Sequence, residues 1–302
     1  MSEYLPFGVT WYGVCVSLAA FAAFALLLLR RRQGLARRVD ACKLAVWCIP
    51  CALLGARLMY CLFRFSFFFR EMGPLSVLNM RMGGFLLYGA VFGAMGAAAL
   101  AARHDGVSVV DTLDELAAPG MLAVLICRLA EGTTTEGVGA WVENEALMFF
   151  PLCVQNEYGE WQLALFLLEA LIAAVILVIL LRGRFARGEQ IMTALLLYAC
   201  FQVICESMRA DSCLRIGFVR VSQVISAVVI LAVTVIRSLR YAGRKETALR
   251  AAVFCACAAA VGGMEWALDK TQVDNRLIDL AMLAVCAALA CNGSLYKGRK
   301  RG

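Results

Sequence analysis

Charged residues and histidine are scarce in this chain. Only 17% of its 302 residues are Asp, Glu, Lys or Arg and 62% are hydrophobic, whereas a typical soluble domain has about 25% charged residues. So few charges could not cover the surface of a soluble fold, and a disordered chain would contain fewer hydrophobic residues. The only histidine is His104, which argues against a metal centre with histidine ligands. We therefore expect a polytopic membrane protein that binds neither a metal nor a cofactor.

Cysteine is abundant, but its placement does not indicate a metal or redox site. Most of the 14 cysteines lie in hydrophobic runs, where a thiol behaves as a small hydrophobic group. Cys48 and Cys51 form a CxxC pattern. Because no second cysteine pair and no histidine accompanies this pattern, we interpret these residues as packing residues.

Nine hydrophobic stretches approach the length of a membrane-spanning helix, which needs about 20 mostly hydrophobic residues. The fourth stretch is the weakest, because Asp111, Asp114 and Glu115 lie at its start. The pattern predicts an all-α, polytopic transmembrane helical bundle. Its predicted spans are residues 9–29, 42–63, 84–102, 112–130, 161–181, 190–208, 217–236, 251–268 and 277–292.

The positive charges predict the orientation, because Lys and Arg are enriched in cytoplasmic loops. With the N-terminus outside and the C-terminus in the cytoplasm, the cytoplasmic segments contain 19 of the 29 Lys and Arg residues. The long outer segment 131–160 has six glutamates and no Lys or Arg, and such a segment is readily translocated. Cys153 and Cys213 are the one plausible disulfide pair on the outer side, and whether they pair stays open.

Arginines on the predicted outer side indicate a binding site. Arg57, Arg128 and Arg209 lie at or inside the outer ends of hydrophobic runs, where a mid-membrane arginine costs roughly 3 kcal/mol. Side chains near helix ends could instead reach the membrane surface by snorkelling. A guanidinium that faces a wet cavity is suited to phosphate, with which it forms two hydrogen bonds. Because the abundant phosphate outside a membrane is a phospholipid headgroup, we expect a cavity for an anionic lipid that opens to the outer leaflet.

Polar residues interrupt the hydrophobic pattern at several places. Residues 127–141 read CRLAEGTTTEGVGAW, which is either an ordinary outer loop or the lining of a cavity. Glu206 and Arg209 are three residues apart and share a helix face, as a functional or a structural pair. Tyr88 lies in a glycine-rich segment and either faces a cavity or packs in the core. Glu169 is a further acid inside a hydrophobic run, with no partner nearby in the sequence.

Six segments, taken in their order along the chain, are similar to a known sequence pattern. They are WYG at 11–13, GARLMYCLF at 55–63, MGGFLLYGAVFG at 82–93, RLAEGTTTEGVG at 128–139, YACFQVICESMRAD at 198–211 and SQVIS at 222–226. In this order they resemble the prolipoprotein diacylglyceryl transferase family. The resemblance covers roughly residues 9–236, and the last two predicted spans lie outside it. It therefore predicts two parts, which are a seven-span transferase-like core in residues 1–240 with the outer loop 131–160, and two additional helices with a basic cytoplasmic tail in residues 241–302.

The resemblance also implies an activity. Members of this family transfer a diacylglyceryl group from phosphatidylglycerol to the thiol of the lipobox cysteine of a preprolipoprotein, at the outer face of the bacterial inner membrane. The implied partners are phosphatidylglycerol, the signal segment of a preprolipoprotein and membrane lipids, and no nucleic acid. A transporter is a further alternative, but it would be favoured by inverted repeats, and we see none in the sequence.

Individual site residues follow from the same resemblance. The arginines are expected to hold the phosphate, and the glutamates to position the arginines or the thiol. The predicted catalytic residues are Arg128, Glu136, Tyr88 and Glu206. The predicted substrate-binding residues are Arg57, Arg209, Tyr12, Tyr198, Gly84, Gly139, Gln202 and Glu131.

Three of these positions depart from the family pattern. Tyr88 stands where the family has a histidine, and tyrosine, with a pKa of about 10, is a poorer base at neutral pH. Gln202 replaces an arginine, which removes part of the phosphate site. Glu131 replaces an asparagine and adds negative charge where an anionic lipid would bind. These departures keep open the alternative of a catalytically impaired relative that binds lipid or lipoprotein signal segments.

Overall fold

The described part of the chain is almost entirely helical. The computed structural model describes residues 10–31, 38–134, 136–210, 214–216, 219–241 and 244–270, and four residues between 284 and 288. The long helices within this part are α1 (Trp11–Arg31), α2 (Ala41–Phe63), α3 (Leu87–His104), α4 (Val109–Glu131), α5 (Leu165–Arg182), α6 (Glu189–Met208), α7 (Val221–Tyr241) and α8 (Arg244–Lys270). The predicted all-α, polytopic class is therefore confirmed.

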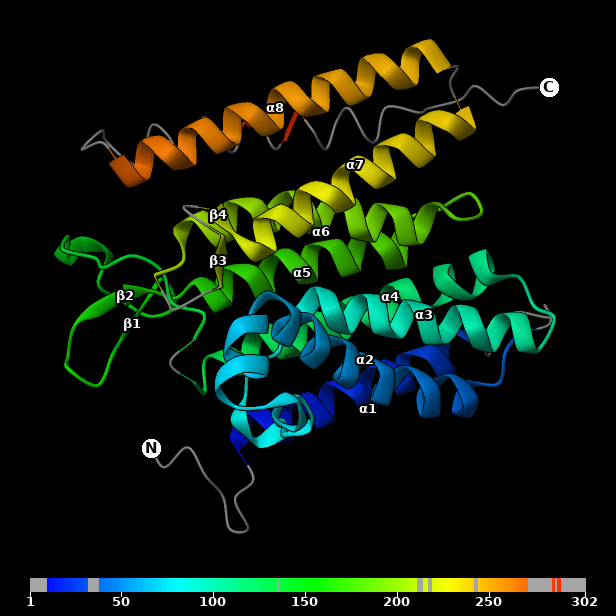
Figure 1. Ribbon diagram of the computed structural model, residues 1–302, viewed down its shortest axis with the longest axis horizontal. Helices are drawn as coiled ribbons and strands as arrows, with labels where there is room; N and C mark the ends of the chain where they lie inside the picture. Colours follow the sequence, from blue (N-terminus) through cyan, green and yellow to red (C-terminus); the bar gives the residue numbers. More distant parts are fainter. Residues whose placement is uncertain are drawn as a thin grey trace. The chain divides into compact units, whose positions relative to one another are not determined.

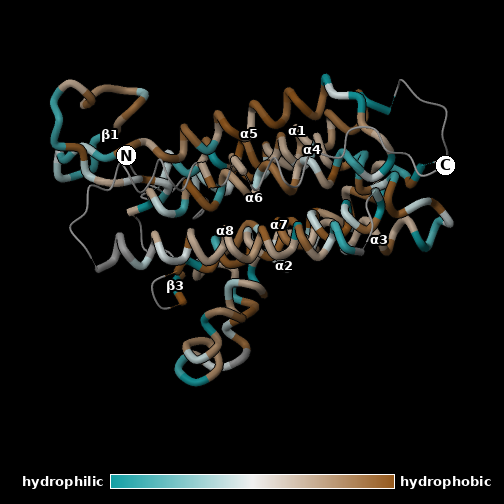
Figure 2. Tube along the Cα trace, turned by 90° about the horizontal axis from the view of Figure 1, so that it is seen from above, coloured by the Kyte–Doolittle hydropathy of each residue, from teal (hydrophilic) through white to brown (hydrophobic). Residues whose placement is uncertain are grey.

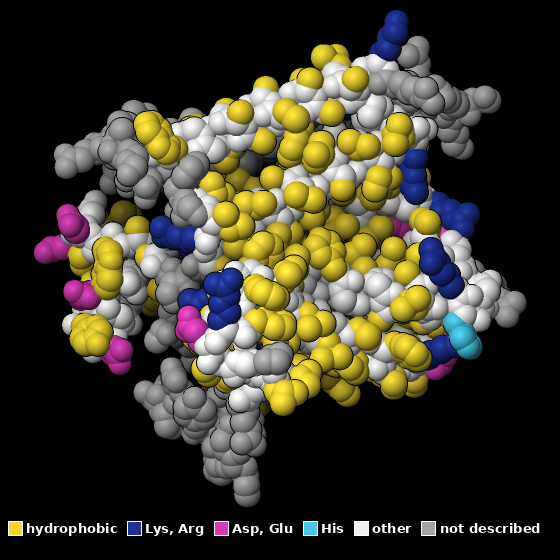
Figure 3. Space-filling view, viewed as in Figure 1, with side chains coloured by type: hydrophobic (Ala, Val, Ile, Leu, Met, Phe, Trp, Pro, Cys, Tyr) yellow, Lys and Arg dark blue, Asp and Glu magenta, His cyan; other side chains and the backbone are white. Residues whose placement is uncertain are grey.

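Six of these helices are long and hydrophobic enough to cross a membrane, namely α1, α2, α5, α6, α7 and the Lys245–Met264 part of α8. Figure 2 shows hydrophobic residues along the helices, and on the face in Figure 3 hydrophobic side chains cover the helices while charged side chains gather near their ends. The predicted spans 84–102 and 112–130 are helical as α3 and α4, but they are not among the six. The predicted span 277–292 lies largely outside the described residues, so the count of nine stays a prediction.

The chain divides into two compact units, which we describe separately. The first unit is formed by residues 1–15, 124–179 and 192–302, and the second unit by residues 16–123 and 180–191. The division of the chain at residue 240, which the resemblance predicts, stays a prediction.

In the second unit, α2 and α3 are in backbone contact because glycines face one another. A Cβ atom added to Gly55 would overlap the carbonyl oxygen of Gly89, and one added to Gly93 would overlap that of Cys51. The Gly89/Gly93 spacing therefore serves the close helix packing for which it is suited.

Ion pairs join several helix ends of the second unit. Nε of Arg31 lies 2.7 Å from a carboxylate oxygen of Glu115. The pKa of Asp105 is lowered from its usual range, chiefly because Lys43 donates a hydrogen bond to its carboxylate. These contacts connect the predicted cytoplasmic ends of α1 to α4.

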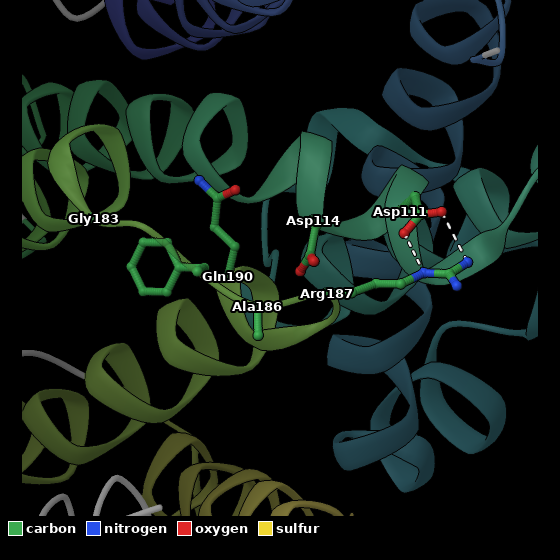
Figure 4. Close-up of a pocket in the computed structure, with 7 residues that line it drawn as sticks. Asp111, Asp114, Gly183, Ala186, Arg187 and Gln190 are labelled. Atoms are coloured by element: carbon green, nitrogen blue, oxygen red, sulfur yellow. Dashed lines mark hydrogen bonds and ion pairs between the residues drawn. The ribbon is translucent and has the colours of Figure 1, made fainter. Parts of the chain in front are cut away.

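A pocket of about 550 Å³ lies beside the segment that joins α5 to α6 (Figure 4). Arg187 pairs with Asp111 at 2.6 Å. Asp114 accepts hydrogen bonds from the backbone amides of Gly188 and Ile191, so it satisfies donors at the start of α6 as a helix cap does. The charged groups of this pocket thus hold the loop in place.

In the first unit, the segment between α4 and α5 carries a short antiparallel hairpin. Strands β1 (Cys153–Gln155) and β2 (Trp161–Leu163) pair with Cys153 opposite Leu163. A second hairpin, β3 (Arg215–Ile216) and β4 (Val219–Arg220), leads into α7. Helix α8 packs along α7 (Figure 1).

Candidate active site

Four segments of the first unit bring charged side chains together at one end of the unit. They are the last turn of α4, the first half of α5, the part of α6 from its middle to its end, and the residue that follows α6. Successive antiparallel spans place the end of one helix beside the start of the next, which explains why these segments meet. We call the group the arginine cluster, and its members are Arg128, Glu131, Glu169, Tyr198, Gln202, Glu206 and Arg209.

Arg128 is the centre of the cluster and is only 6% exposed. Its Nε and Nη2 atoms donate hydrogen bonds to Oη of Tyr198 at 3.2 and 2.9 Å, and Nη2 also donates to Oε1 of Gln202 at 3.2 Å. Its Nη1 atom pairs with Glu131 and, at 3.1 Å, with Glu169. Because a buried charge is costly unless it is paired and hydrogen-bonded, this set of partners explains how the chain can hold an arginine here.

Arg209 completes a ring of four alternating charges, which we call the square. Its members are Arg128, Glu131, Arg209 and Glu169. The Nη2 atom of Arg209 lies 2.8 Å from Oε2 of Glu131 and 2.7 Å from Oε2 of Glu169. Each of the two carboxylates therefore bridges Arg128 and Arg209. These ion pairs of Arg209 are made across helices, and the pair with Glu206 that their spacing suggested stays a prediction.

Gln202 connects the square to Glu206. Its Nε2 atom donates to Oε1 of Glu169 at 3.3 Å and to Oε1 of Glu206 at 2.8 Å, while its Oε1 atom accepts from Arg128. A primary amide can do both because it has a donor and an acceptor end. Oε2 of Glu206 is buried and has no hydrogen-bond partner among the described residues.

The loop that follows α4 is fixed against Arg209 through its backbone. Gly139 and Arg209 form a β-bridge, and the amide of Ala210 donates to the carbonyl oxygen of Val138 at 3.0 Å. A Cβ atom on Gly139 would lie 3.0 Å from both Cβ of Leu163 and the carbonyl oxygen of Met208. Gly139, predicted as a substrate-binding residue, therefore permits close packing of this loop.

Two further predicted residues of the first unit lie outside the square. Tyr12, in α1, is within electrostatic range of Arg128, Glu131 and Glu136. Glu136 is exposed, and its backbone amide donates to Oγ1 of Thr134.

Arg57 belongs to the second unit and is 1% exposed. Its guanidinium donates to the backbone carbonyl oxygens of Val77 at 3.1 Å, Ser76 at 3.2 Å, Gly84 at 3.2 Å and Gly83. It also lies over the ring of Phe68, 4.8 Å from the centroid. In this structure Arg57 organises the segment 76–84, and its role in phosphate binding stays a prediction.

Gly84, whose carbonyl oxygen accepts from Arg57, and Tyr88 also belong to the second unit. Gly84 has a φ of +76°, and a Cβ atom there would overlap the ring of Tyr60. Tyr88 is buried in the first turn of α3 and stacks with Phe92, with ring centroids 6.2 Å apart. The role of Tyr88 in the site stays a prediction.

Glu169 is the cluster residue to which sequence reasoning assigned no role. It lies in the first half of α5 and is 2% exposed. The available signal was an acid inside a hydrophobic run. Its partners Arg128, Gln202 and Arg209 are 33 to 41 positions away, so only tertiary packing identifies them.

Cys153 is buried, and this burial raises the pKa of its thiol. Cys213 lies outside the described residues, so the open question of a Cys153–Cys213 disulfide is not decided.

The fold and the site define a multi-pass helical membrane protein with a buried arginine–glutamate cluster where four of its segments meet. The family model for prolipoprotein diacylglyceryl transferase matches residues 1–238, and the chain belongs to this family. Three relatives named phosphatidylglycerol–prolipoprotein diacylglyceryl transferase give the degree of similarity. The Clostridium kluyveri protein is 28% identical over 79% of this chain and 95% of the relative. The Clostridium novyi protein is 30% identical over 74% of this chain and 88% of the relative. The Shouchella clausii protein is 29% identical over 75% of this chain and 84% of the relative.

Proposed function

We propose that this protein transfers a diacylglyceryl group from phosphatidylglycerol to the lipobox cysteine thiol of a preprolipoprotein. The observation that carries the proposal is the match of the family model across residues 1–238. That range contains every member of the arginine cluster, both arginines included.

The reaction requires displacement at a glycerol carbon. The sulfur of the substrate cysteine attacks the carbon that bears the phosphate, so that a carbon–sulfur bond forms and the carbon–oxygen bond to the phosphate breaks. The departing group is glycerol phosphate, which carries away the bonding electron pair, and the thiol proton passes to a base and then to solvent. Because the nucleophile belongs to the substrate, the cysteines of this chain take no part in the proposed reaction.

Arg128 and Arg209 are the proposed phosphate ligands. Negative charge grows on the phosphate oxygen as the carbon–oxygen bond breaks, and guanidinium groups that are already oriented stabilise that charge. Tyr198 and Gln202 contact Arg128, and Glu169 contacts Arg209. These contacts support the role, since they orient the arginines before the lipid binds.

We propose roles for the other predicted residues of each unit as well. Glu136 and Glu206 position the arginines or the thiol, and Tyr88 lines the site. The remaining proposed substrate-binding residues are Arg57, Tyr12, Tyr198, Gly84, Gly139 and Gln202, and Glu131 lies where the lipid phosphate is proposed to bind.

We also propose that the cluster faces the outer side of a bacterial inner (plasma) membrane, with the N-terminus outside and the C-terminus in the cytoplasm. The basic ends of α1, α5 and α7, which carry Arg31, Arg182 and Arg240, support this orientation. Arginines at helix ends are expected on the cytoplasmic side.

The proposal is tested with the purified full-length protein, phosphatidylglycerol vesicles and a synthetic lipobox peptide. We expect diacylglyceryl peptide and glycerol phosphate in equal amounts, measured by mass spectrometry and by a coupled assay for glycerol phosphate. Arg128→Ala should reduce the rate at least about 100-fold, the usual effect of removing a main transition-state donor. Arg184→Ala, at an exposed arginine in the loop after α5, is the matched control and should keep the parental rate.

A second candidate function is lipid binding without catalysis. It is favoured by the two carboxylates that already occupy Arg128 and Arg209. The same experiment separates the two functions. No product under conditions in which the Clostridium kluyveri relative is active, together with saturable binding of phosphatidylglycerol, would replace the transferase proposal by the binding one.

A further inference from the structure

The carboxylate of Glu131 lies between the two guanidiniums of the arginine cluster. Its Oε1 atom accepts from Nη1 of Arg128, and its Oε2 atom lies 2.8 Å from Nη2 of Arg209. Two arginines bind two oxygens of a phosphate group in a similar way. We infer that Glu131 is an internal competitor for the lipid phosphate, which must displace this side chain to reach the arginines. The inference rests on the proposed function.

The backbone provides a space for the Glu131 carboxylate. Gly137 has a φ of +76°, and a Cβ atom there would lie 2.7 Å from Oε2 of Glu131 and 2.9 Å from Cβ of Phe166. The carbonyl oxygen of Gly137 accepts from the amide of Phe166 at 2.7 Å, which fixes the glycine beside the start of α5. The glutamate is thus accommodated by the surrounding packing, although it replaces the family's asparagine.

Glu131 is also the carboxylate of the square that can leave it most easily. It is the last residue of α4, and its side chain is 12% exposed. Glu169 lies within α5, and its side chain is 2% exposed. A rotation about the side-chain bonds of Glu131 would take its carboxylate towards the loop, whereas Glu169 is enclosed by packed residues. Glu169 therefore stays with the arginines when Glu131 moves away.

The charges of the square determine which ligand can replace Glu131. Arg128 and Arg209 together with Glu131 and Glu169 have a net charge of zero. Once Glu131 leaves, the cluster has one negative charge fewer, so an anionic group such as the phosphodiester of phosphatidylglycerol can take the place of its carboxylate. The glycerol phosphate product is a monoester with a charge of about −2. The return of Glu131 would then compete with this product and promote its release.

The test compares the parent with Glu131→Gln and with Glu131→Asn, which restores the family residue. Binding is measured with the full-length protein in lipid nanodiscs of phosphatidylcholine that contain increasing amounts of phosphatidylglycerol. Both variants should bind phosphatidylglycerol about tenfold more tightly, because the competing charge-assisted hydrogen bonds are lost. Glycerol phosphate, added in solution, should inhibit transfer at about tenfold lower concentration than in the parent.

Glu157→Gln is the matched control, since Glu157 is an exposed carboxylate in the same outer segment. It should leave both affinities unchanged. Loss of a merely structural residue would not make binding tighter, so the direction of the change identifies the competing role. If either neutral variant loses its thermal transition, Glu131→Asp takes its place. Its carboxylate is one methylene shorter and cannot bridge both arginines, and a smaller gain in affinity is then expected.

The results of the binding and transfer measurements distinguish the inference from the transferase proposal. Equal or weaker phosphatidylglycerol binding by folded variants would overturn the inference, and a gain for glycerol phosphate alone would overturn the assignment to a lipid headgroup. A parent that makes no product, with variants that bind phosphatidylglycerol more tightly, would refute the transferase proposal and leave the competition by Glu131 supported. An active parent whose affinity does not respond to Glu131 substitution would refute the competition alone.

Discussion

The carboxylate of Glu169 contacts both arginines of the cluster, at 3.1 Å from Arg128 and 2.7 Å from Arg209. It also accepts a hydrogen bond from Gln202. Two like charges that are close together inside a protein repel one another strongly, because the surroundings screen them weakly. A carboxylate shared by both guanidiniums offsets that repulsion. The individual residues of the site are therefore best understood as one network, in which each charge depends on its neighbours.

Glu169→Ala should destabilise the protein by about 3 kcal/mol, because removal of one partner leaves buried charge uncompensated. The measurement is reversible denaturant unfolding in detergent, followed by tryptophan fluorescence. Glu143→Ala, which removes an exposed carboxylate from the outer loop, should change the free energy of unfolding by less than about 0.5 kcal/mol. Equal stabilities of the two variants would contradict the role of Glu169.

At the level of helices, α2 and α3 are held in contact by the absence of side chains. In a membrane the hydrophobic effect does not drive helices together, so close van der Waals packing of small residues becomes important. Gly55, Gly89 and Gly93 provide this contact, because each would bring an added Cβ atom onto the backbone of the facing helix. The segment 76–84, whose carbonyl oxygens accept hydrogen bonds from Arg57 of α2, is positioned by this helix pair.

Gly93→Ala should push α2 and α3 apart and destabilise the protein by about 1–3 kcal/mol, the usual cost of overpacking. The control is Gly96→Ala in the same helix, where an added Cβ atom meets nothing within 4 Å. That substitution should be neutral or stabilising by up to about 1 kcal/mol, because alanine favours the helical conformation. Melting temperatures in detergent test both expectations, and a Gly93→Ala variant as stable as Gly96→Ala would refute the proposed contact.

At the level of the whole molecule, the distribution of charged residues predicts on which side of the membrane each loop lies. Hydrophobic side chains cover the helices, and charged ones gather near their ends (Figure 3). The segment 131–160 carries only negative charge, whereas the segment 182–189 carries three arginines. Positively charged loops are retained in the cytoplasm, so these two segments should lie on opposite sides.

A protease recognition site inserted between Tyr158 and Gly159 should be cleaved by protease added to intact spheroplasts. The position is a turn in which Tyr158 is highly exposed, so the insertion should not disturb the fold. The same site inserted after Arg184 should be cleaved only after the membrane is opened. Immunoblots with a C-terminal tag measure both reactions, and the reverse pattern would contradict the proposed orientation.

The class of the protein and most of its helices are determined locally, which is why they could be predicted. Hydrophobic runs coincide with α1, α2, α5, α6 and α7 to within a few residues. Arg128 and Arg209 could be chosen as site residues because a cation inside a hydrophobic run needs a special environment. The partners on other helices could not be predicted in this way. The ion pairs of Arg209 cross to Glu131 of α4 and Glu169 of α5, and no local spacing indicates them.

The amino-acid sequence by itself determined that the protein is helical and crosses a membrane, because both properties depend on local hydrophobicity and helix periodicity. It also predicted which cations stand apart from the cytoplasmic loops. Only the tertiary structure decided which charges meet. In it, the carboxylates of Glu169 and Glu131 each pair with both arginines of the cluster. The guanidinium of Arg57 donates hydrogen bonds to backbone carbonyl oxygens. The physical reason is that charge pairing depends on distances of a few ångströms between helices, and these distances follow from packing between residues far apart in the chain.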